Sequence, residues 1–407
     1  MADGITRIAV EGFKSIVNRQ EIEIAPLTIL AGANSSGKSS IMQPLLMLKQ
    51  TLEATYDPGP LKIDGPNIRF TSSDEFLSKV PNRNHPFSFE ITAAHLQFEI
   101  IFQKSQSSGI EVLQESLTEA GQRRTTLRPD MSADEIRTQV GVKESGNLSI
   151  VPLRFFLNVT GEGTRASMMT WIAPFIEDVI HVPGLRGTTS RTYPGAAVGH
   201  GFAGTFEYYT ASAVFLWQRQ RHQKYEDLIR DMQKLELAQN VLAKRLNDAE
   251  MQVLVNRTEG SPNDMVSIAD VGFGVSQVLP VLVALRAANE GQLVYLEEPE
   301  IHLHPRAQVK LADILADAVK RGVRVVAETH STLLLTAIQT LVAKGELKPE
   351  LIKLHWFQRD PKTGVTRVTT ANLDENGAFG DWPEDFDDVI LKAESAYLDA
   401  VEGRQVR

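Results

Sequence analysis

An α/β fold, in which a parallel sheet follows a mostly β front part, is predicted by three observations along the 407-residue sequence. Leu27–Leu30 is a short, apolar, β-branched run that leads through a glycine-rich turn into a helical pattern from Ser40 to Leu52. Strand and helix patterns alternate again between 293 and 342, which is typical of parallel strands joined by helices. The segments on either side of the first turn read as strands without intervening helices, so the front part is expected to be mostly β.

Periodicity places the remaining elements in order. In the front part, strands are expected at Ile5–Val10, Glu21–Ile24, Phe87–Ala93, Leu96–Phe102 and Leu148–Leu157. In the middle, helical patterns cover Met168–Val179 and Phe206–Gln220, and a stripe with helical spacing runs through Tyr225, Leu228, Met232 and Leu235. In the back part, strands at 293–296 and 323–327 alternate with helices at 305–320 and 332–342, before a hairpin around 361–364. Because 251–255 alternates like a strand, we expect the helix to stop near Asn240. The stripe is then too short for a sustained coiled coil, so we expect it to pack in the core.

Residues 32–39 read Gly-Ala-Asn-Ser-Ser-Gly-Lys-Ser, a complete P-loop between a predicted strand and a predicted helix. Such a turn gathers backbone N–H groups at a helix N-terminus, where an anion is favoured, and its glycines allow turns that a side chain would block. Lys38 is expected to reach the β- and γ-phosphates, and Ser39 to bind Mg²⁺. The nucleotide-binding residues expected here are Gly32, Ala33, Asn34, Ser35, Ser36, Gly37, Lys38, Ser39 and Ser40.

The predicted strand at 293–296 ends in two carboxylates, Glu297 and Glu298. In parallel α/β sheets, ligand chemistry lies at the carboxyl ends of the strands, which is also where the P-loop lies. One carboxylate there can hold Mg²⁺, and a second can orient and deprotonate an attacking water. His330 ends the next strand, where an imidazole can contact a γ-phosphate. A solvated acidic turn and a structural histidine are the alternative interpretations.

A second glycine-rich segment, Asp270–Gln277, opens a predicted helix at 278–288. It offers a second helix N-terminus that attracts anions. One nucleotide does not need two phosphate-binding loops from the same chain. If two chains face each other, each nucleotide can be bound by the P-loop of one chain and the second glycine-rich segment of the other. His302 and His304 stand two residues apart, and because no third ligand is evident, a metal site is the less favoured interpretation there.

The order of these motifs resembles that of the ABC-type ATPases of the SMC/RecF/OLD group. Glu11–Ser15 is similar to the "FKS" opening of that group, 298–305 looks like its "DEPExxLHP" segment, and Val271–Gln277 resembles the ABC signature. Gly377–Phe386 is similar to a C-terminal module of prokaryotic ATPases in this group. The resemblance spans most of the chain and is strongest at 5–50 and 265–335.

The resemblance implies a composite ATPase domain at 1–371 and an acidic, aromatic tail at 372–407. The domain would consist of a P-loop and β lobe (1–160), a mainly helical insertion (161–260) and a lobe with the signature, Walker B and switch histidine (261–371). The implied catalytic residues are Lys38, the Walker B acid Glu297, the catalytic glutamate Glu298 and the switch histidine His330. Ser39 and Glu297 would hold Mg²⁺, and Lys14 would contact the nucleotide. Gly274, Ser276 and Gln277 would bind ATP held by a second subunit, so that ATP joins a head-to-tail homodimer or a higher homo-oligomer.

The chain departs from the family pattern in several places. The Walker B acid is glutamate where aspartate is usual, and the extra methylene matters to a metal that demands near-ideal octahedral geometry. The division of roles between Glu297 and Glu298 therefore stays open. The signature reads Phe-Gly-Val-Ser-Gln instead of Leu-Ser-Gly-Gly-Gln, so either Gly274 or Ser276 can take the place of its serine. No Q-loop glutamine stands out, too little chain follows His330 for a TOPRIM nuclease domain, and no long arm separates the two halves.

Composition limits the partners and the compartment. The net charge of −9 argues against a protein coated in nucleic acid, although a local basic groove is compatible with it. The candidates for such a DNA-binding groove are Lys14, Arg186, Arg191 and the cluster Arg219–Arg221. The absence of cysteine excludes disulfides and thiolate metal sites, and the cytoplasm is the expected compartment. No apolar run is long enough to span a bilayer, and the first residues lack the apolar core of a signal peptide.

The leading hypothesis for function is an ATP-hydrolysing dimeric switch that controls a separate effector, a nuclease or a toxin. Its setting would be prokaryotic antiphage defence or DNA-related maintenance, by analogy with the group. The acidic tail is either a docking surface for the effector or a solvated terminus. The alternatives are the nucleotide-binding subunit of a transporter, a small-molecule kinase, and a slow-turnover scaffold locked by ATP.

Overall fold

A six-stranded, largely parallel sheet forms the centre of the computed structural model, which describes residues 4–79, 86–105, 109–121, 124–142, 147–161, 164–186, 191–199, 201–258 and 264–379. Its strands, in spatial order, are β11 (Ile180–Val182), β16 (Leu293–Glu297), β17 (Arg324–Thr329), β3 (Leu27–Gly32), β18 (Ile352–Arg359) and β19 (Thr366–Ala371). All neighbours are parallel except β18 and β19, which form the predicted hairpin. The P-loop strand β3 therefore lies inside the sheet and two strands from the Glu297 strand.

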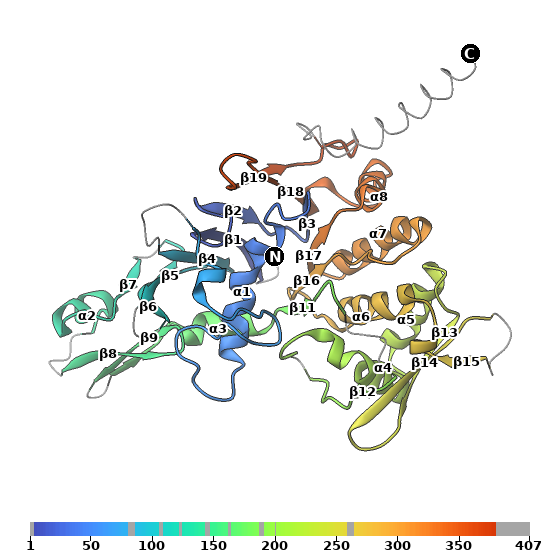
Figure 1. Cartoon of the computed structure of the whole chain (residues 1–407), viewed down its shortest axis with the longest axis horizontal. Helices are drawn as coiled ribbons and strands as arrows, with labels where there is room; N and C mark the ends of the chain where they lie inside the picture. The colour runs from blue at the N-terminus through green and yellow to red at the C-terminus, as the bar shows by residue number, and fades with distance from the viewer. Residues whose placement is uncertain are drawn as a thin grey trace, which may run out of the picture.

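The front part is mostly β, as predicted (Figure 1). An antiparallel sheet runs in the order β2 (Gln20–Glu23), β1 (Ile5–Glu11), β4 (Phe87–Ala93), β5 (Leu96–Ser105), β6 (Gly109–Glu119) and β7 (Thr125–Leu127). A smaller sheet holds β8 (Leu148–Leu153), β9 (Phe156–Gly161) and β10 (Thr164–Ala166). The strand region expected at 148–157 is confirmed, and a turn at Arg154, with φ of 56°, divides it into the hairpin of β8 and β9.

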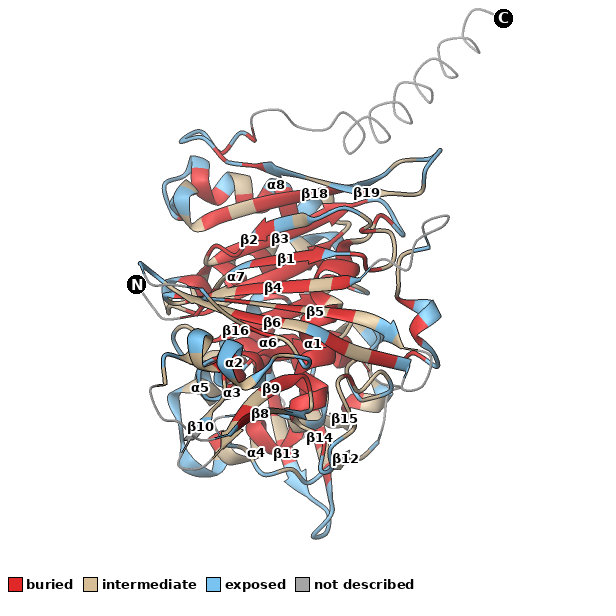
Figure 2. Ribbon diagram, turned by 90° about the vertical axis from the view of Figure 1, so that its left-hand side faces the viewer, coloured by how far each residue is buried: buried red, intermediate tan, exposed pale blue. Residues whose placement is uncertain are grey.

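Helix α1 (Lys38–Leu52) lies between the central sheet and the antiparallel sheet, and nearly all of its residues are buried. Its side chains join one hydrophobic core with the facing strands and with α3 (Met169–Glu177). Figure 2 shows this interior as a continuous run of buried strands. The short α2 (Ala133–Val140) packs at the far edge of the β lobe, where Ser132 and Glu135 form a capping box.

The other face of the central sheet is covered by helices. They are α6 (Phe273–Ala287), α7 (Pro305–Lys320) and α8 (Thr332–Ala343), with α4 (Thr210–Gln220) and α5 (Gln223–Lys234) beyond them. Proline at the first position of α7 and Gly322 after its end, with φ of 84°, delimit that helix as the sequence predicts. Leu228, Met232 and Leu235 of the α5 stripe are buried in this second core, which confirms the packing interpretation.

The segment 161–260, expected to be mainly helical, contains more strand than predicted. Beside α3, α4 and α5 it holds β10, β11, β12 (Tyr193–Pro194), β13 (Asn240–Arg245) and β14 (Glu250–Asn256), and β15 (Met265–Ser267) pairs with β14. β14 confirms the alternation at 251–255 as a strand. The two-residue β12 and three-residue β11 are too short for a recognisable alternation, and no pattern was assigned to β13. Short 3-10 turns occupy Ser73–Glu75, Phe206–Tyr209, Ile268–Asp270 and Pro349–Leu351. Of the predicted acidic tail, residues 380–407 lie outside the described part.

Candidate functional site

The P-loop has the conformation that its glycines permit. Gly32 and Gly37 have φ of 146° and 103°, and α1 begins at Lys38, so the first N–H groups of a long helix face the loop. The Lys38 ammonium donates to the carbonyl oxygens of Gly32 and Ala33, both at 3.0 Å. Burial lowers the pKa of Lys38, and the carboxylates of Glu328, Glu298 and Glu300 act against that effect. The loop is therefore formed with its lysine folded over it.

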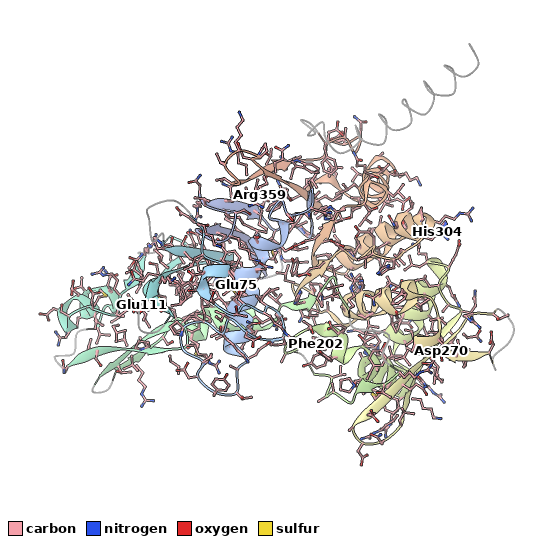
Figure 3. The ribbon with its side chains drawn as sticks, viewed as in Figure 1. Glu75, Glu111, Phe202, Asp270, His304 and Arg359 are labelled. Atoms are coloured by element: carbon pink, nitrogen blue, oxygen red, sulfur yellow. The ribbon has the colours of Figure 1, made fainter. Side chains whose placement is uncertain are left out.

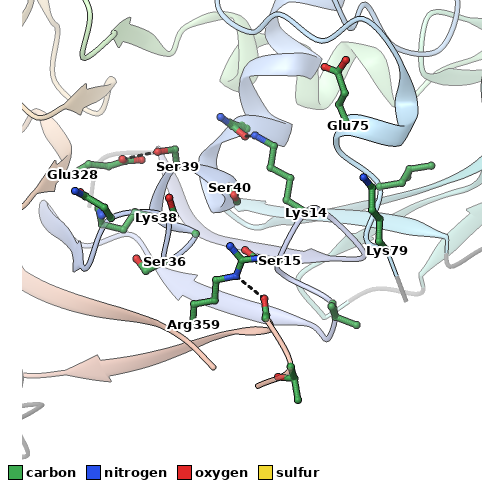
Figure 4. Close-up of a pocket in the computed structure, with 18 of the residues that line it drawn as sticks. Lys14, Ser15, Ser36, Lys38, Ser39, Ser40, Glu75, Lys79, Glu328 and Arg359 are labelled. Carbon is green, nitrogen blue, oxygen red and sulfur yellow. Dashed lines mark hydrogen bonds between the residues drawn. The ribbon is translucent and has the colours of Figure 1, made fainter. Parts of the chain in front are cut away.

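A pocket of about 580 Å³ opens beside the P-loop (Figure 4). Its walls come from six segments that are separate in sequence. They are the P-loop with the start of α1, the turn after β1 and the Ser73–Glu75 region, the ends of β16 and β17, and the β18–β19 hairpin. Three residues predicted to carry chemistry, Lys38, Glu298 and His330, line it together. Figure 3 shows Glu75 and Arg359, which also line it, near the middle of the molecule.

Glu298 and His330 face each other across the pocket. His330 Nε2 lies 3.7 Å from Glu298 Oε1, and the Glu298 N–H donates to the Glu328 carbonyl at 3.0 Å. Glu298 has φ of 44°, a left-handed conformation that non-glycine residues rarely adopt. Burial, followed by the charge of Lys38, lowers the pKa of His330, which favours a neutral imidazole at pH 7. Glu300 supports this histidine, because its Oε1 accepts from Thr329 Oγ1 at 2.5 Å and from the His330 N–H at 3.2 Å.

Lys14, expected to contact the nucleotide, also lines the pocket. Its ammonium donates to Gln43 Oε1 at 2.7 Å and lies 4.7 Å from the centre of the Phe70 ring. Burial lowers the pKa of Lys14, and the charge of Glu75 opposes that shift. The turn that carries Lys14 is fixed to the hairpin, since the Thr366 N–H donates to the Ser15 carbonyl at 2.7 Å.

Glu297 does not line this pocket. Its Oε1 lies 3.1 Å from His181 Nε2, and its Oε2 accepts from the Gly184 N–H at 3.0 Å. Burial raises the pKa of Glu297, but the hydrogen bond and charge of His181 and the Gly184 N–H outweigh burial, so that the net pKa is lowered. The Glu297 carboxylate thus binds His181 and the segment after β11. The prediction that Glu297 shares a metal ion with Ser39 is not supported by this arrangement.

Arg186 connects this region to the second glycine-rich loop. The guanidinium donates to the carbonyls of Glu297 and Glu298 through Nη2, at 2.7 and 2.8 Å, and to the Gln277 carbonyl through Nη1 at 2.7 Å. The side chain is only 4% exposed, and burial lowers its pKa to about 10, which leaves it charged at pH 7. Arg186 is therefore a buried residue that links three backbone carbonyls, and it cannot line a DNA groove.

The residues of the second glycine-rich loop lie outside the P-loop pocket. Gly274 packs against the His302 carbonyl, and the buried Ser276 hydroxyl donates to the Phe273 carbonyl at 3.0 Å. Gln277 is also buried, and its Nε2 donates to the Arg186 carbonyl at 2.9 Å. Phe273, by contrast, is 59% exposed at the start of α6. Within one chain, this loop and the P-loop do not form a shared site.

One buried carboxylate at the P-loop was missed by sequence reasoning. Glu328 lies on β17, 3% exposed, and its Oε2 accepts from Ser39 Oγ at 2.8 Å while Oε1 accepts from the Tyr295 hydroxyl. Burial, and then the charge of Glu297, raise the pKa of Glu328 to about 7. The sequence does contain a sign of this residue, because a carboxylate follows the apolar run Val325–Ala327 two residues before His330.

Other predicted residues are dispersed. Arg191 pairs with Asp270 at 2.6 Å on the surface, Arg219 and Arg221 lie at the end of α4, and none of the three lines the P-loop pocket with Lys14. Within the described ranges, no group of three or more His, Asp or Glu side chains is arranged to hold a metal, and the two-histidine site at 302–304 gains no support. Among the helices that the structure describes, none has both the length and the apolar character needed to cross a membrane.

Two known families match separate parts of the chain. A family described as "AAA ATPase domain" matches residues 4–140, and one described as "AAA domain, putative AbiEii toxin, Type IV TA system" matches residues 220–336. The first segment holds the P-loop, and the second holds the glycine-rich loop, Glu298 and His330. Both descriptions name an AAA ATPase domain, and these matches support the resemblance of the motif order to the ABC-type ATPases of the SMC/RecF/OLD group.

Several solved structures are similar at low identity. An SMC head bound to the C-winged helix domain of ScpA is 13% identical, with a TM-score of 0.49, over 91% of this chain and 98% of that chain. The SMC head domain from Thermotoga maritima is 10% identical, with a TM-score of 0.40, over 90% and 98%. An SMC head with an extended coiled coil, bound to a ScpA domain from Pyrococcus furiosus, is 11% identical, with a TM-score of 0.42, over 98% and 100%. No curated protein matches the chain.

Proposed function

We propose that this chain binds and hydrolyses ATP in the P-loop pocket. The observation that carries the proposal is the convergence of Lys38, Glu298 and His330, from three separate segments, on one cavity of nucleotide size. Because the three residues come from neighbouring parallel strands and the P-loop, their side chains meet at one edge of the sheet.

Each residue has a distinct role in the proposed reaction. Lys38 and the N–H groups at the start of α1 bind the phosphates. Glu298, which lines the pocket and whose side chain is 40% exposed, orients and deprotonates the attacking water. The neutral His330 imidazole, 3.7 Å from Glu298, contacts the γ-phosphate and reports its presence.

Magnesium is the expected cofactor of such a site, and the donors fit it. The Ser39 hydroxyl and a neighbouring carboxylate are hard oxygen ligands, and Mg²⁺ in nucleotide sites is held by one or two protein groups with the substrate phosphates. When bound, the metal neutralises charge on the phosphates as the terminal bond breaks. Lys14 and Gln43, joined by a hydrogen bond of 2.7 Å, also line the pocket, and in this proposal they contact the rest of the nucleotide.

The active assembly in this proposal is a homodimer or a higher homo-oligomer. The loop at 272–277 lies apart from the P-loop of its own chain, and the side chains of Ser276 and Gln277 are engaged internally. The backbone at 272–274 and the exposed Phe273 are then left to meet ATP on a second copy. ATP would join the two copies, and hydrolysis would release them.

The output of the cycle is proposed to be control of a separate effector protein, a nuclease or a toxin, in antiphage defence or DNA-related maintenance. The family match at 220–336, whose description names a toxin of a type IV system, supports this direction. Co-purification with the products of adjacent genes, in ATP and in ADP, would test it. An adjacent permease that binds the chain instead would favour the transporter alternative.

The central experiment compares nucleotide binding, phosphate release and mass in solution. Lys38→Ala should abolish ATP binding, and Lys344→Ala, at an exposed lysine, is the matched control. Glu298→Gln should bind ATP, lose turnover by about 10²-fold or more, and accumulate as an ATP-bound dimer. A Glu298→Gln variant that stays monomeric with saturating ATP would contradict the dimer. Unchanged phosphate release would contradict the role of Glu298 and favour a scaffold.

A further inference from the structure

Glu328 occupies the position beside the P-loop serine that Glu297 was expected to fill. β17 lies between β16 and β3, and Glu328 is paired in register with Glu297 on one side and with Leu30 on the other. Its side chain points to the α1 face of the sheet, where Oε2 accepts from Ser39 Oγ at 2.8 Å (Figure 4). The carboxylate also lines the nucleotide pocket.

The carboxylate of Glu328 is held in a fixed orientation. The Tyr295 hydroxyl donates to its second oxygen, and Tyr295 is itself fully buried and stacked on the His181 ring at 5.4 Å. Such outer contacts fix the direction in which a metal-binding carboxylate presents its oxygens. One oxygen of Glu328 thus faces Ser39, and the other is used for orientation.

Glu297 lacks this access. It stands one strand farther from β3, and its two oxygens are engaged by His181 Nε2 and the Gly184 N–H, at 3.1 and 3.0 Å. Freeing them would break a buried arrangement that also includes Asn67, whose Oδ1 lies 3.0 Å from His181 Nδ1. Glu297 therefore acts in the scaffold of the site.

We infer that Glu328, and not Glu297, is the protein carboxylate that serves the magnesium ion of the bound nucleotide, together with Ser39. This inference rests on the proposed function, because it presupposes a metal–nucleotide complex at the P-loop. The inference assigns the metal-binding carboxylate to β17, the strand before His330, instead of β16, the strand that leads into the Glu-Glu-Pro-Glu segment. The same strand end then supplies both the metal carboxylate and the γ-phosphate contact.

The test measures metal affinity directly and does not depend on turnover. Mn²⁺ binding to the protein–ADP complex is followed by electron paramagnetic resonance in wild type, Glu328→Gln and Glu297→Gln. Nucleotide affinity is measured in parallel with a fluorescent ADP in EDTA. We expect Glu328→Gln to weaken Mn²⁺ binding by about 10- to 100-fold, with metal-free ADP affinity unchanged, and Glu297→Gln to retain Mn²⁺ affinity.

Because Glu328 is buried, its replacement by glutamine can destabilise the fold, so Glu328→Asp is measured as well. It keeps the charge but withdraws it by one methylene, and it should weaken Mn²⁺ binding while preserving the thermal unfolding temperature more closely. Loss of Mn²⁺ affinity in Glu297→Gln, with wild-type affinity in both Glu328 variants, would overturn the inference and leave the proposed function standing. A wild type that binds no nucleotide at all would instead overturn the proposed function.

Discussion

Arg186 and Gln277 exchange hydrogen bonds across the interior of the molecule. Arg186 Nη1 donates to the Gln277 carbonyl at 2.7 Å, and Gln277 Nε2 donates back to the Arg186 carbonyl at 2.9 Å. Because Nη2 of the same guanidinium holds the carbonyls of Glu297 and Glu298, the start of α6 and the end of β16 are fastened to one rigid planar group. The loop that would meet a second copy is thereby tied to the glutamate that would act on the chain's own nucleotide.

Arg186→Lys should separate these two elements. A lysine has no planar fork and cannot hold the carbonyls of Gln277, Glu297 and Glu298 at once. We expect ATP turnover to fall by roughly tenfold or more while nucleotide affinity stays within about twofold, because Arg186 does not line the pocket. Steady-state phosphate release and fluorescent-nucleotide titration measure the two quantities.

The control for this variant is Arg191→Lys, at an exposed arginine that pairs with Asp270. It should turn over ATP like the wild type, since surface ion pairs contribute little. An equal loss of nucleotide affinity and turnover in Arg186→Lys would indicate general unfolding of the site. It would contradict the proposed role of Arg186 in joining the start of α6 to the end of β16.

Thr366 fastens the β18–β19 hairpin to the P-loop. Its hydroxyl is fully buried, donates to the Ser36 carbonyl at 2.7 Å and lies 2.8 Å from Ser15 Oγ. Thr366→Val keeps the shape but removes both contacts and leaves the Ser36 carbonyl without this donor. We expect the free energy of unfolding to drop by about 1–2 kcal/mol and nucleotide affinity to fall several-fold, measured by denaturant titration and calorimetry.

Thr369→Val, at an exposed position on the same strand, is the matched control and should leave both quantities unchanged. Wild-type nucleotide affinity in Thr366→Val would mean that the P-loop keeps its conformation without the hairpin.

Local sequence patterns predicted the P-loop and the edge of the sheet that carries Glu298 and His330. The strand, the glycine turn and the helix at 27–52 are adjacent in the chain, so their relation follows from local geometry. The convergence of Glu298 and His330 follows from a general property, because the carboxyl ends of parallel strands meet at one edge.

The order of the strands could not be read in the same way. No local pattern places β17 between β3 and β16, yet this order decides that Glu328 reaches Ser39 and that Glu297 does not. The hydrogen bonds of Arg186 to Gln277, Glu297 and Glu298 could not be predicted for a related reason. It depends on β11, a three-residue edge strand too short to produce a recognisable alternation.

Gly274 should be intolerant of a side chain for a packing reason. A Cβ at this position would lie 2.9 Å from the His302 carbonyl oxygen, a backbone atom that moves only if the turn at 301–304 shifts. Gly274→Ala should therefore lower the free energy of unfolding by about 1–3 kcal/mol, measured by denaturant titration. Gly272→Ala, where a Cβ would meet no atom within 4 Å, is the matched control and should cost less. Equal losses would show that the approach to His302 is not the limiting contact.

Glu115 makes the stability of the β lobe depend on pH. The carboxyl is fully buried on β6, where its Oε2 accepts from the Leu157 N–H of β9 at 2.6 Å, and burial raises its pKa to about 8. The unfolded chain releases this proton near pH 4.5, so between about pH 4.5 and 8 the folded state binds more protons than the unfolded state. The free energy of unfolding must then fall as pH rises through that window, by up to about 1.4 kcal/mol per pH unit from this group alone.

Glu115→Gln removes this dependence, because the amide stays neutral and presents the same acceptor to the Leu157 N–H. We expect wild type and variant to be similarly stable near pH 5, and the variant to become the more stable of the two as pH approaches 8, in denaturant titrations across that range. Glu111→Gln, at a half-buried position on the same strand whose Oε1 accepts from Gln103 Nε2 at 2.6 Å, is the matched control and should follow the wild-type curve (Figure 3). Since all other titrating groups act equally in the three proteins, parallel curves for wild type and Glu115→Gln would mean that Glu115 is ionised in the folded chain.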